Sequence, residues 1–174
     1  DTAPTGAAYI FVSDVNGDNA IIVVPGAGAE MTVAELEVSR DAIASSRVFV
    51  TQLEQTLEVA RRGLEIAREA GVTTVFNPAP ATAIPDDMYP LCDYVIPNES
   101  EATMLTGLAV STLDEARKAG DALLAKGVKT ALITLGGRGS LLHSAGKSEV
   151  IAPVNAGKVV ETTGAGDSFV GAFA

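Results

Sequence analysis

Residues 57–76 read Leu-Glu-Val-Ala-Arg-Arg-Gly-Leu-Glu-Ile-Ala-Arg-Glu-Ala-Gly-Val-Thr-Thr-Val-Phe, and this stretch decides the predicted fold. Its first half repeats apolar residues at spacings of three and four, which predicts a helix with one apolar face. These residues are Leu57, Ala60, Leu64 and Ala67. Gly71 ends the helix, and the β-branched run after it predicts a strand at 72–76. A helix that leads directly into a buried strand is typical of βαβ units with a parallel sheet.

The same alternation continues on both sides of this stretch. Strands are predicted at 48–50, 94–96 and 130–134, with shorter ones at 140–143 and 150–151. Helices are predicted at 32–44, 99–105 and 112–124, and a last one follows a glycine-rich turn near residue 164. Thr32 with Glu35, and Thr112 with Glu115, have the capping-box spacing that begins a helix. The sequence therefore predicts an α/β fold, in which helices cover a mostly parallel sheet in the Rossmann-like three-layer manner.

The first 30 residues lie outside this alternation. Two β-rich runs, 8–12 and 20–24, flank the turn signal Asn16-Gly17, which predicts a β-hairpin. The hairpin is expected to be a flap or an edge ribbon. We therefore expect two parts: a hairpin segment at 1–30 and an α/β core at 31–174.

The composition limits the class of partner. The 174 residues are 47% apolar and carry a net charge of −10, so one sizeable core is expected and a nucleic-acid partner is not. No apolar run is long enough to cross a bilayer. Cys92 and His143 are each the only residue of their type. The chain therefore cannot form an internal disulfide and has no Cys/His ligand set for zinc. A single cysteine fits a reducing, cytoplasmic location. The chain starts at Asp1 and stops at Ala174 inside a predicted helix, so both ends are expected to be cut.

The segment Gly164-Ala165-Gly166-Asp167 is a candidate catalytic turn. Glycines let the backbone approach a ligand closely, and the N–H groups that begin the next helix bind an anion such as a phosphate. A carboxylate beside them can accept the proton of a hydroxyl that attacks a phosphoryl group. Asp167 can equally be an ordinary residue of a helix cap. Spacing alone leaves both interpretations open.

Polar and glycine-rich groups also follow the other predicted strands, where ligands bind in parallel sheets. Asn98 and Glu101, three apart at a helix start, suit a hydrated Mg²⁺, although an ordinary capping box has the same spacing. The turn Gly136-Gly137-Arg138-Gly139 can pass under the phosphates of a nucleotide or can simply connect strands. Glu54 can bind the hydroxyls of a sugar or can be a solvated acid.

Several other site types are excluded by their spacing. Gly164 and Gly166 lack the third glycine of a dinucleotide fingerprint, and the glycine needed for a Walker A motif is missing before Gly146. Ser168 lies in no G-x-S-x-G elbow of a serine hydrolase.

Taken together, these motifs resemble the ribokinase-like carbohydrate kinases, a family that includes fructokinases, adenosine kinase and the minor phosphofructokinases. Residues 162–167 match the family's C-terminal signature, and Asn98-Glu99-Ser100-Glu101 matches its N-x-x-E motif. Other segments resemble the ribokinase branch in particular. They are Pro4-Thr5-Gly6, 21–27, Gln52-Leu53-Glu54 and 77–81.

The resemblance implies a role for each matching residue. Asp167 would be the catalytic base, with the amides of Gly164, Ala165 and Gly166 as the anion hole. The ATP site would include Asn98, Thr134, Gly136, Gly137, Gly139 and Gly166. Glu54 would bind the sugar, together with Asp167. Glu101 would hold Mg²⁺ through water, and Glu161 and Thr163 would bind a monovalent cation, usually K⁺. The hairpin would belong to a lid through which two subunits pair as a homodimer.

The chain departs from the family pattern in three respects. Glu161 stands where members commonly have Asp, which puts direct cation coordination in doubt, and Gly28 stands where ribokinases often have Asn. Family members are also longer at both ends, and their additional segments supply further sugar and adenine contacts.

Three functions therefore remain open. The first is a kinase that transfers the γ-phosphoryl group of ATP to O5 of D-ribose. The second is a related kinase with fructose or a nucleoside as acceptor. The third, for the 174 residues alone, is a module that binds nucleotide without catalysis.

Overall fold

The computed structural model describes residues 3–13, 15, 19–154, 157, 159 and 162–174. The predicted Asn16-Gly17 turn and Glu161 lie outside the described residues.

The core is a six-stranded sheet with the order β3-β4-β5-β6-β7-β8. The first four strands are parallel, and β7 and β8 are antiparallel to their neighbours. The strands are β3 (Val48–Thr51), β4 (Thr73–Phe76), β5 (Tyr94–Val95), β6 (Thr130–Thr134), β7 (Ser140–Ser144) and β8 (Lys147–Ile151). The predicted mostly parallel sheet is therefore confirmed.

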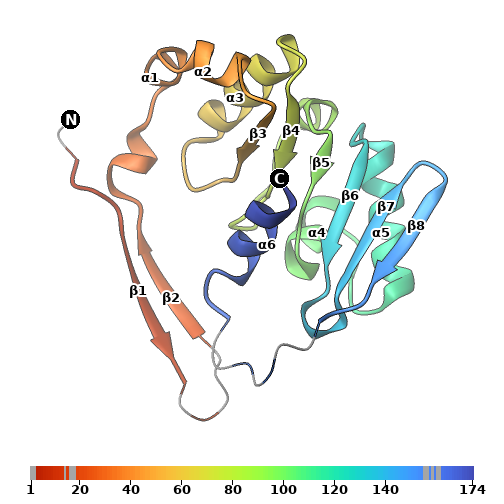
Figure 1. Ribbon diagram of the computed structural model, residues 1–174. Helices are drawn as coiled ribbons and strands as arrows, with labels where there is room; N and C mark the ends of the chain where they lie inside the picture. The colour runs from red at the N-terminus through yellow and green to blue at the C-terminus, as the bar shows by residue number, and fades with distance from the viewer. Residues whose placement is uncertain (1–2, 14, 16–18, 155–156, 158, 160–161) are drawn as a thin grey trace.

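Helices lie on both faces of the sheet, as Figure 1 shows. One face packs against α3 (Leu57–Glu69), α4 (Glu99–Thr106) and α5 (Leu113–Ala125). The other face packs against α6 (Ala165–Phe173). Successive strand residues point to opposite faces, so in β4 Val75 joins Val170 of α6 while Phe76 joins Leu64 of α3. The predicted three-layer arrangement is confirmed.

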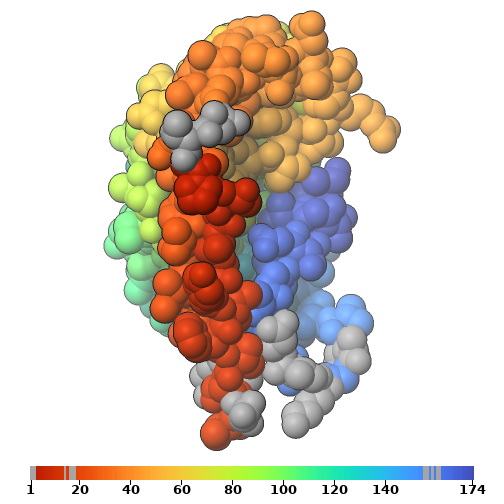
Figure 2. Space-filling view, turned by 90° about the vertical axis from the view of Figure 1, so that its left-hand side faces the viewer, coloured from red at the N-terminus to blue at the C-terminus, as the bar shows by residue number. Residues whose placement is uncertain are grey.

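The hairpin is separate from the main sheet. Strands β1 (Ala7–Val12) and β2 (Asn19–Val24) pair only with each other among the described residues, in the register Ala7↔Val24 to Val12↔Asn19. Figure 2 shows the hairpin running along one side of the molecule, beside the C-terminal segment. Its apolar side chains are exposed on both faces of the ribbon.

The predicted helix at 32–44 is wrong in one respect, because it is divided in two. The Thr32–Glu35 capping box forms as expected. However, α1 (Val33–Glu37) stops before Val38 and Ser39, and α2 (Arg40–Ala44) begins after them. Val and Ser are weak helix formers. Three short 3₁₀ helices were also not anticipated: η1 (Gly26–Glu30), η2 (Asp86–Leu91) and η3 (Gly136–Arg138).

Within the described part of the chain, no helix combines the length and the apolar character that a membrane span requires.

Candidate active site

The predicted site residues follow the carboxyl ends of the parallel strands. Backbone hydrogen bonds continue the sheet beyond β4 and β5 and hold these strand ends beside those of β3 and β6. The N–H of Asn77 donates to the carbonyl of Thr51 (2.9 Å), that of Ile96 to Phe76 (2.8 Å), and that of Thr134 to Pro97 (2.9 Å). The segments that contain Glu54, Asn98 and Gly136 are therefore anchored along one edge. Helix α6 also begins on this side of the sheet (Figure 1).

The start of α6 differs from the starts of the helices that have a side-chain cap. Gly164 is the N-cap residue, with φ of 71°, and it offers no side chain to the first amides. By contrast, Thr32, Asn98 and Thr112 cap α1, α4 and α5 with their side chains. The glycine at this position allows the left-handed conformation and leaves the helix end open to a ligand.

The amides of this turn are not equally available. The N–H of Ala165 donates to the carbonyl of Thr162 (3.1 Å), and the carbonyl of Gly164 accepts from Ser168 (2.9 Å). The N–H groups of Gly166 and Asp167 make no hydrogen bond to a described residue. An anion at this helix end is therefore offered the amides of Gly166 and Asp167 more directly than that of Ala165.

Asp167 is exposed in the first turn of α6 and forms no hydrogen bond or ion pair within the described part of the chain. Its carboxylate does not cap the helix, since Gly164 occupies the cap position. The geometry is compatible with both interpretations: Asp167 lies in the first helical turn, and its oxygens can accept a proton from a ligand.

Asn98 and Glu101 form a complete capping box. The Oδ1 atom of Asn98 accepts from the N–H of Glu101 (2.9 Å), and the N–H of Asn98 donates to Oε2 of Glu101 (2.8 Å). Glu101 is only 6% exposed. Burial raises the pKa of its carboxyl group, and the hydrogen bond from Asn98 only partly offsets this effect.

The carboxylate of Glu101 is chemically suited to hold a hydrated Mg²⁺. Its Oε1 atom has no hydrogen-bond partner among the described residues, and a nearby cation would favour the charged form that burial disfavours. The described residues contain no group of three or more His, Cys, Asp or Glu side chains that could hold a metal directly. The fit is therefore to an ion that keeps its waters and takes few protein ligands.

The glycine turn after β6 is tightly folded at one end and open at the other. Gly139 has φ of 90°, and a Cβ there would collide with the carbonyl oxygen of Ile151. A Cβ at Gly136 or Gly137 would meet no other atom within 4 Å. Thr134, half-buried, lies just before the turn. A ligand can thus approach the backbone closely at Gly136 and Gly137.

Glu54 lies in the β3–α3 connection, close to the end of the hairpin segment. Its side chain is exposed, and its carbonyl oxygen lies 3.7 Å from the position of a Cβ on Gly28. No contact joins Glu54 to Asp167 among the described residues. The structure therefore places the backbone of Glu54 beside η1, after the hairpin strands, but does not bring these two carboxylates together.

A link between the hairpin and the segment just before α6 was missed by the sequence reasoning. The side-chain amide of Asn19, the first residue of β2, donates to the hydroxyl of Thr163 (3.1 Å) and lies 3.5 Å from that of Thr162. An asparagine beside a turn carries no signal of a partner 144 positions away. Of the two predicted cation ligands, only Thr163 is described, and its hydroxyl already accepts this hydrogen bond.

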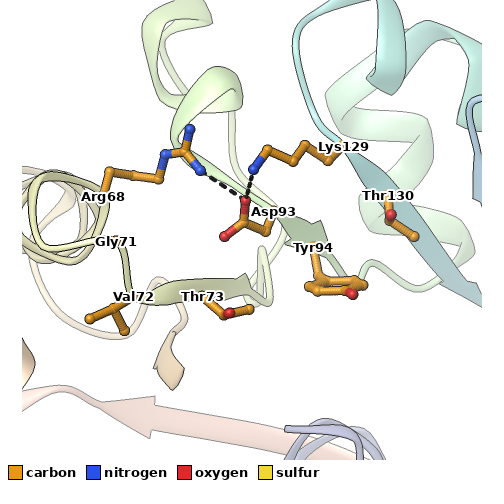
Figure 3. A pocket seen from close by; sticks show the side chains of 8 residues that line it. All are labelled: Arg68, Gly71, Val72, Thr73, Asp93, Tyr94, Lys129 and Thr130. Carbon is orange, nitrogen blue, oxygen red and sulfur yellow. Dashed lines mark hydrogen bonds and ion pairs between the residues drawn. The ribbon is translucent and has the colours of Figure 1, made fainter. Parts of the chain in front are cut away.

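A cavity of about 530 Å³ lies at the opposite edge of the sheet (Figure 3). It is found at the amino ends of β4, β5 and β6 and contains none of the predicted site residues. Asp93 organises it: one carboxylate oxygen pairs with Arg68 (2.8 Å) and Lys129 (2.6 Å), and the other accepts from the N–H of Thr74 (2.9 Å). Each of these charged groups is paired, and together they connect three strands of the sheet to α3. The arrangement indicates that the cluster stabilises the fold.

Comparison with known proteins agrees with the geometry. The whole chain, residues 1–174, matches the family described as pfkB family carbohydrate kinase. It is 40% identical to a ribokinase of Staphylococcus aureus (strain COL), covering 98% of this chain and 56% of the relative. It is 34% identical to a deoxyribokinase of Salmonella typhi, covering 98% of this chain and 55% of the relative. The chain thus spans just over half the length of the curated relatives it matches.

A solved structure has the same fold. The ribokinase of Arabidopsis thaliana, complexed with ribose and ATP, superposes with a TM-score of 0.86 at 30% identity. The match covers 99% of this chain and 56% of that one.

Proposed function

Since this chain belongs to the pfkB family of carbohydrate kinases, we propose that the whole protein is an ATP-dependent sugar kinase that phosphorylates D-ribose at O5. The products are ribose 5-phosphate and ADP. The observation that carries the proposal is the glycine-capped start of α6, where the amides of Gly166 and Asp167 and the carboxylate of Asp167 have no partner among the described residues. The ribokinase relatives and the ribokinase structure with ribose and ATP support this choice of substrates.

In the proposed reaction, Asp167 accepts the proton of the sugar's O5 hydroxyl. The O5 oxygen forms a bond to the γ-phosphorus as the bond to the bridging oxygen of ATP breaks, and ADP leaves. The amides at the start of α6, those of Gly166 and Asp167 foremost, stabilise the negative charge that develops. Gly164 and Ala165 form the turn that orients these amides toward the phosphoryl group.

The nucleotide is proposed to lie along the edge formed by Asn98 and the turn after β6. Gly136, Gly137 and Gly139 would let its phosphates or sugar approach the backbone, next to Thr134. Glu101 would hold hydrated Mg²⁺, an ion that neutralises phosphate charge when bound. Glu161 and Thr163 remain the proposed site for a monovalent cation such as K⁺. Glu54 would bind the hydroxyls of ribose beneath the hairpin.

A substrate panel with the full-length protein tests the choice of acceptor. We expect ribose to give the highest kcat/KM, with ribose 5-phosphate identified by phosphorus NMR. The deoxyribokinase relative makes 2-deoxyribose the strongest competing acceptor. A higher kcat/KM for 2-deoxyribose, fructose or adenosine would overturn the assignment of ribose. ATP binding without transfer to any sugar would favour a non-catalytic nucleotide-binding module.

A further inference from the structure

The turn after β6 has a single residue with a side chain. Three of its four residues are glycines, and the fourth is Arg138. A Cβ on Gly136 or Gly137 would stand in open space. The only side chain that the turn itself can use as an anchor is that of Arg138.

Arg138 is bonded to two other segments. Its Nη1 atom donates to the carbonyl of Ser111 (2.7 Å), and its Nη2 atom donates to Oε1 of Glu99 (3.0 Å). Ser111 precedes the cap of α5, and Glu99 is the first residue of α4. The planar guanidinium can satisfy both acceptors at once, which a lysine ammonium does less well.

The segments joined in this way carry the proposed nucleotide residues. Glu99 lies between Asn98 and Glu101 in chain order, so Arg138 ties the glycine turn to the first turn of α4. A backbone hydrogen bond from Thr134 to Pro97 (2.9 Å) joins the same two segments on the inner side. Together the two ties fix the spacing between Gly136 and Asn98.

We propose that Arg138 is a positioning residue that preorganises the ATP site by holding the glycine turn against α4. The inference rests on the proposed nucleotide-binding role of that turn. Glu99 and Ser111 each accept one hydrogen bond from the guanidinium, and Arg138 is proposed to act through these partners rather than on the phosphates. The ion pair is partly exposed (side chains 48% and 35% exposed), so its loss should change global stability little.

Steady-state kinetics of the full-length protein test this role. Arg138→Ala should raise the KM for ATP about three- to tenfold, while the KM for ribose stays within about twofold. Glu99→Ala should raise the KM for ATP in the same direction but by no more than Arg138→Ala does, because the hydrogen bond from Arg138 to the carbonyl of Ser111 (2.7 Å) remains. The double variant should be no worse than Arg138→Ala alone, since Glu99 acts through Arg138. Arg117→Ala is the matched control, because Arg117 forms an exposed ion pair with Asp114 (2.8 Å) away from the turn.

Three kinetic results would contradict the role proposed for Arg138. An unchanged KM for ATP in Glu99→Ala, with a raised KM in Arg138→Ala, would show that the tie to α4 does not organise the ATP site and would overturn the proposal. Additive effects, or no effect of Arg138→Ala, would also overturn it.

Hydrogen exchange separates this inference from the proposed function. The N–H groups of Arg138 and Gly139 donate within the turn, to Leu135 (3.0 Å) and Gly136 (3.1 Å). Their exchange should be faster in both Arg138→Ala and Glu99→Ala and unchanged in Arg117→Ala. If the wild-type protein phosphorylates no sugar, the proposed function fails, and exchange alone decides whether Arg138 anchors the turn. Unchanged exchange in both variants would overturn the anchor whatever the activity.

Discussion

Glu101 and Glu115 occupy the same capping-box position on two helices, but their carboxyl groups are perturbed in opposite directions. Burial raises the pKa of Glu101. Hydrogen bonds from the backbone of Ser111 and Thr112 lower the pKa of Glu115, which is only half-buried. The ionised form is therefore favoured at Glu115 and disfavoured at Glu101. A cation bound near Glu101 would favour its ionised form and offset the effect of burial.

This difference predicts opposite responses to removing the charge. A lowered pKa means that Glu115 stabilises the fold above its usual value of 4.5 and that this contribution is lost as the pH falls below it. A raised pKa means that ionised Glu101 costs stability at neutral pH. At pH 7 without ligands, Glu115→Gln should lower the Tm, whereas Glu101→Gln should leave it unchanged or raise it. Thermal unfolding at pH 7 and pH 3 measures both effects.

The Mg²⁺ dependence of the kinase activity should be changed by Glu101→Gln and not by Glu115→Gln. Glu101→Gln should weaken the apparent affinity for Mg²⁺ about 10–100-fold, because the amide keeps an acceptor for Asn98 but loses the charge. Glu115→Gln should leave the Mg²⁺ dependence as it is. Equal Mg²⁺ titrations for wild type and Glu101→Gln would remove Glu101 from the metal site.

At the scale of elements, local patterns predicted the structure wherever a short segment decides it. The stripe containing Leu64 and the capping boxes of α1, α4 and α5 formed because spacing and cap chemistry act within one or two turns. The break at Val38 was missed, because helix propensity there is only weakly unfavourable. The capping box at Asn98 and the site interpretation of Glu101 were treated as alternatives, yet the capping geometry leaves Oε1 of Glu101 free, so the two are compatible.

Contacts between distant elements were beyond sequence reasoning. The bond from Asn19 to Thr163 joins β2 to the turn before α6, and the bonds of Arg138 join the turn after β6 to α4. Neither pairing leaves a periodic trace in the chain, because each depends on how separate elements pack in space.

Asn19→Ala tests the first of these contacts. Loss of the amide should free the hairpin from the catalytic turn, so water should reach the γ-phosphate more often. In the full-length protein we expect the ratio of ATP hydrolysis to ribose phosphorylation to rise several-fold, on the order of one lost hydrogen bond. Val15→Ala, which truncates a 95% exposed side chain on the same hairpin, is the control. An unchanged ratio in Asn19→Ala would show that the contact does not couple the hairpin to the site.

At the scale of the molecule, the hairpin exposes apolar side chains along both of its strands, and such a surface is typical of an interaction site. Phe11 and Ile22 are 60% and 57% exposed. We propose that two copies of the full-length protein pair through this ribbon and form a homodimer.

Ile22→Asp should weaken that dimer, because it places a charge on the proposed interface. Sedimentation equilibrium should show the dissociation constant rising at least tenfold, on the order of 1.4 kcal/mol. Val38→Asp, at an 87% exposed position between α1 and α2, should leave the association unchanged. A wild-type protein that sediments as a monomer at all concentrations would contradict the proposed pairing.

The central claim is that the start of α6 is a phosphoryl-transfer site with Asp167 as the base. Asp167→Asn in the full-length protein tests it most directly, because the side chain keeps its size and loses only the ability to accept the proton. The account predicts that kcat for ribose falls on the order of 10²–10⁴-fold while ATP, measured by calorimetry, still binds. A kcat close to that of the wild type would contradict it.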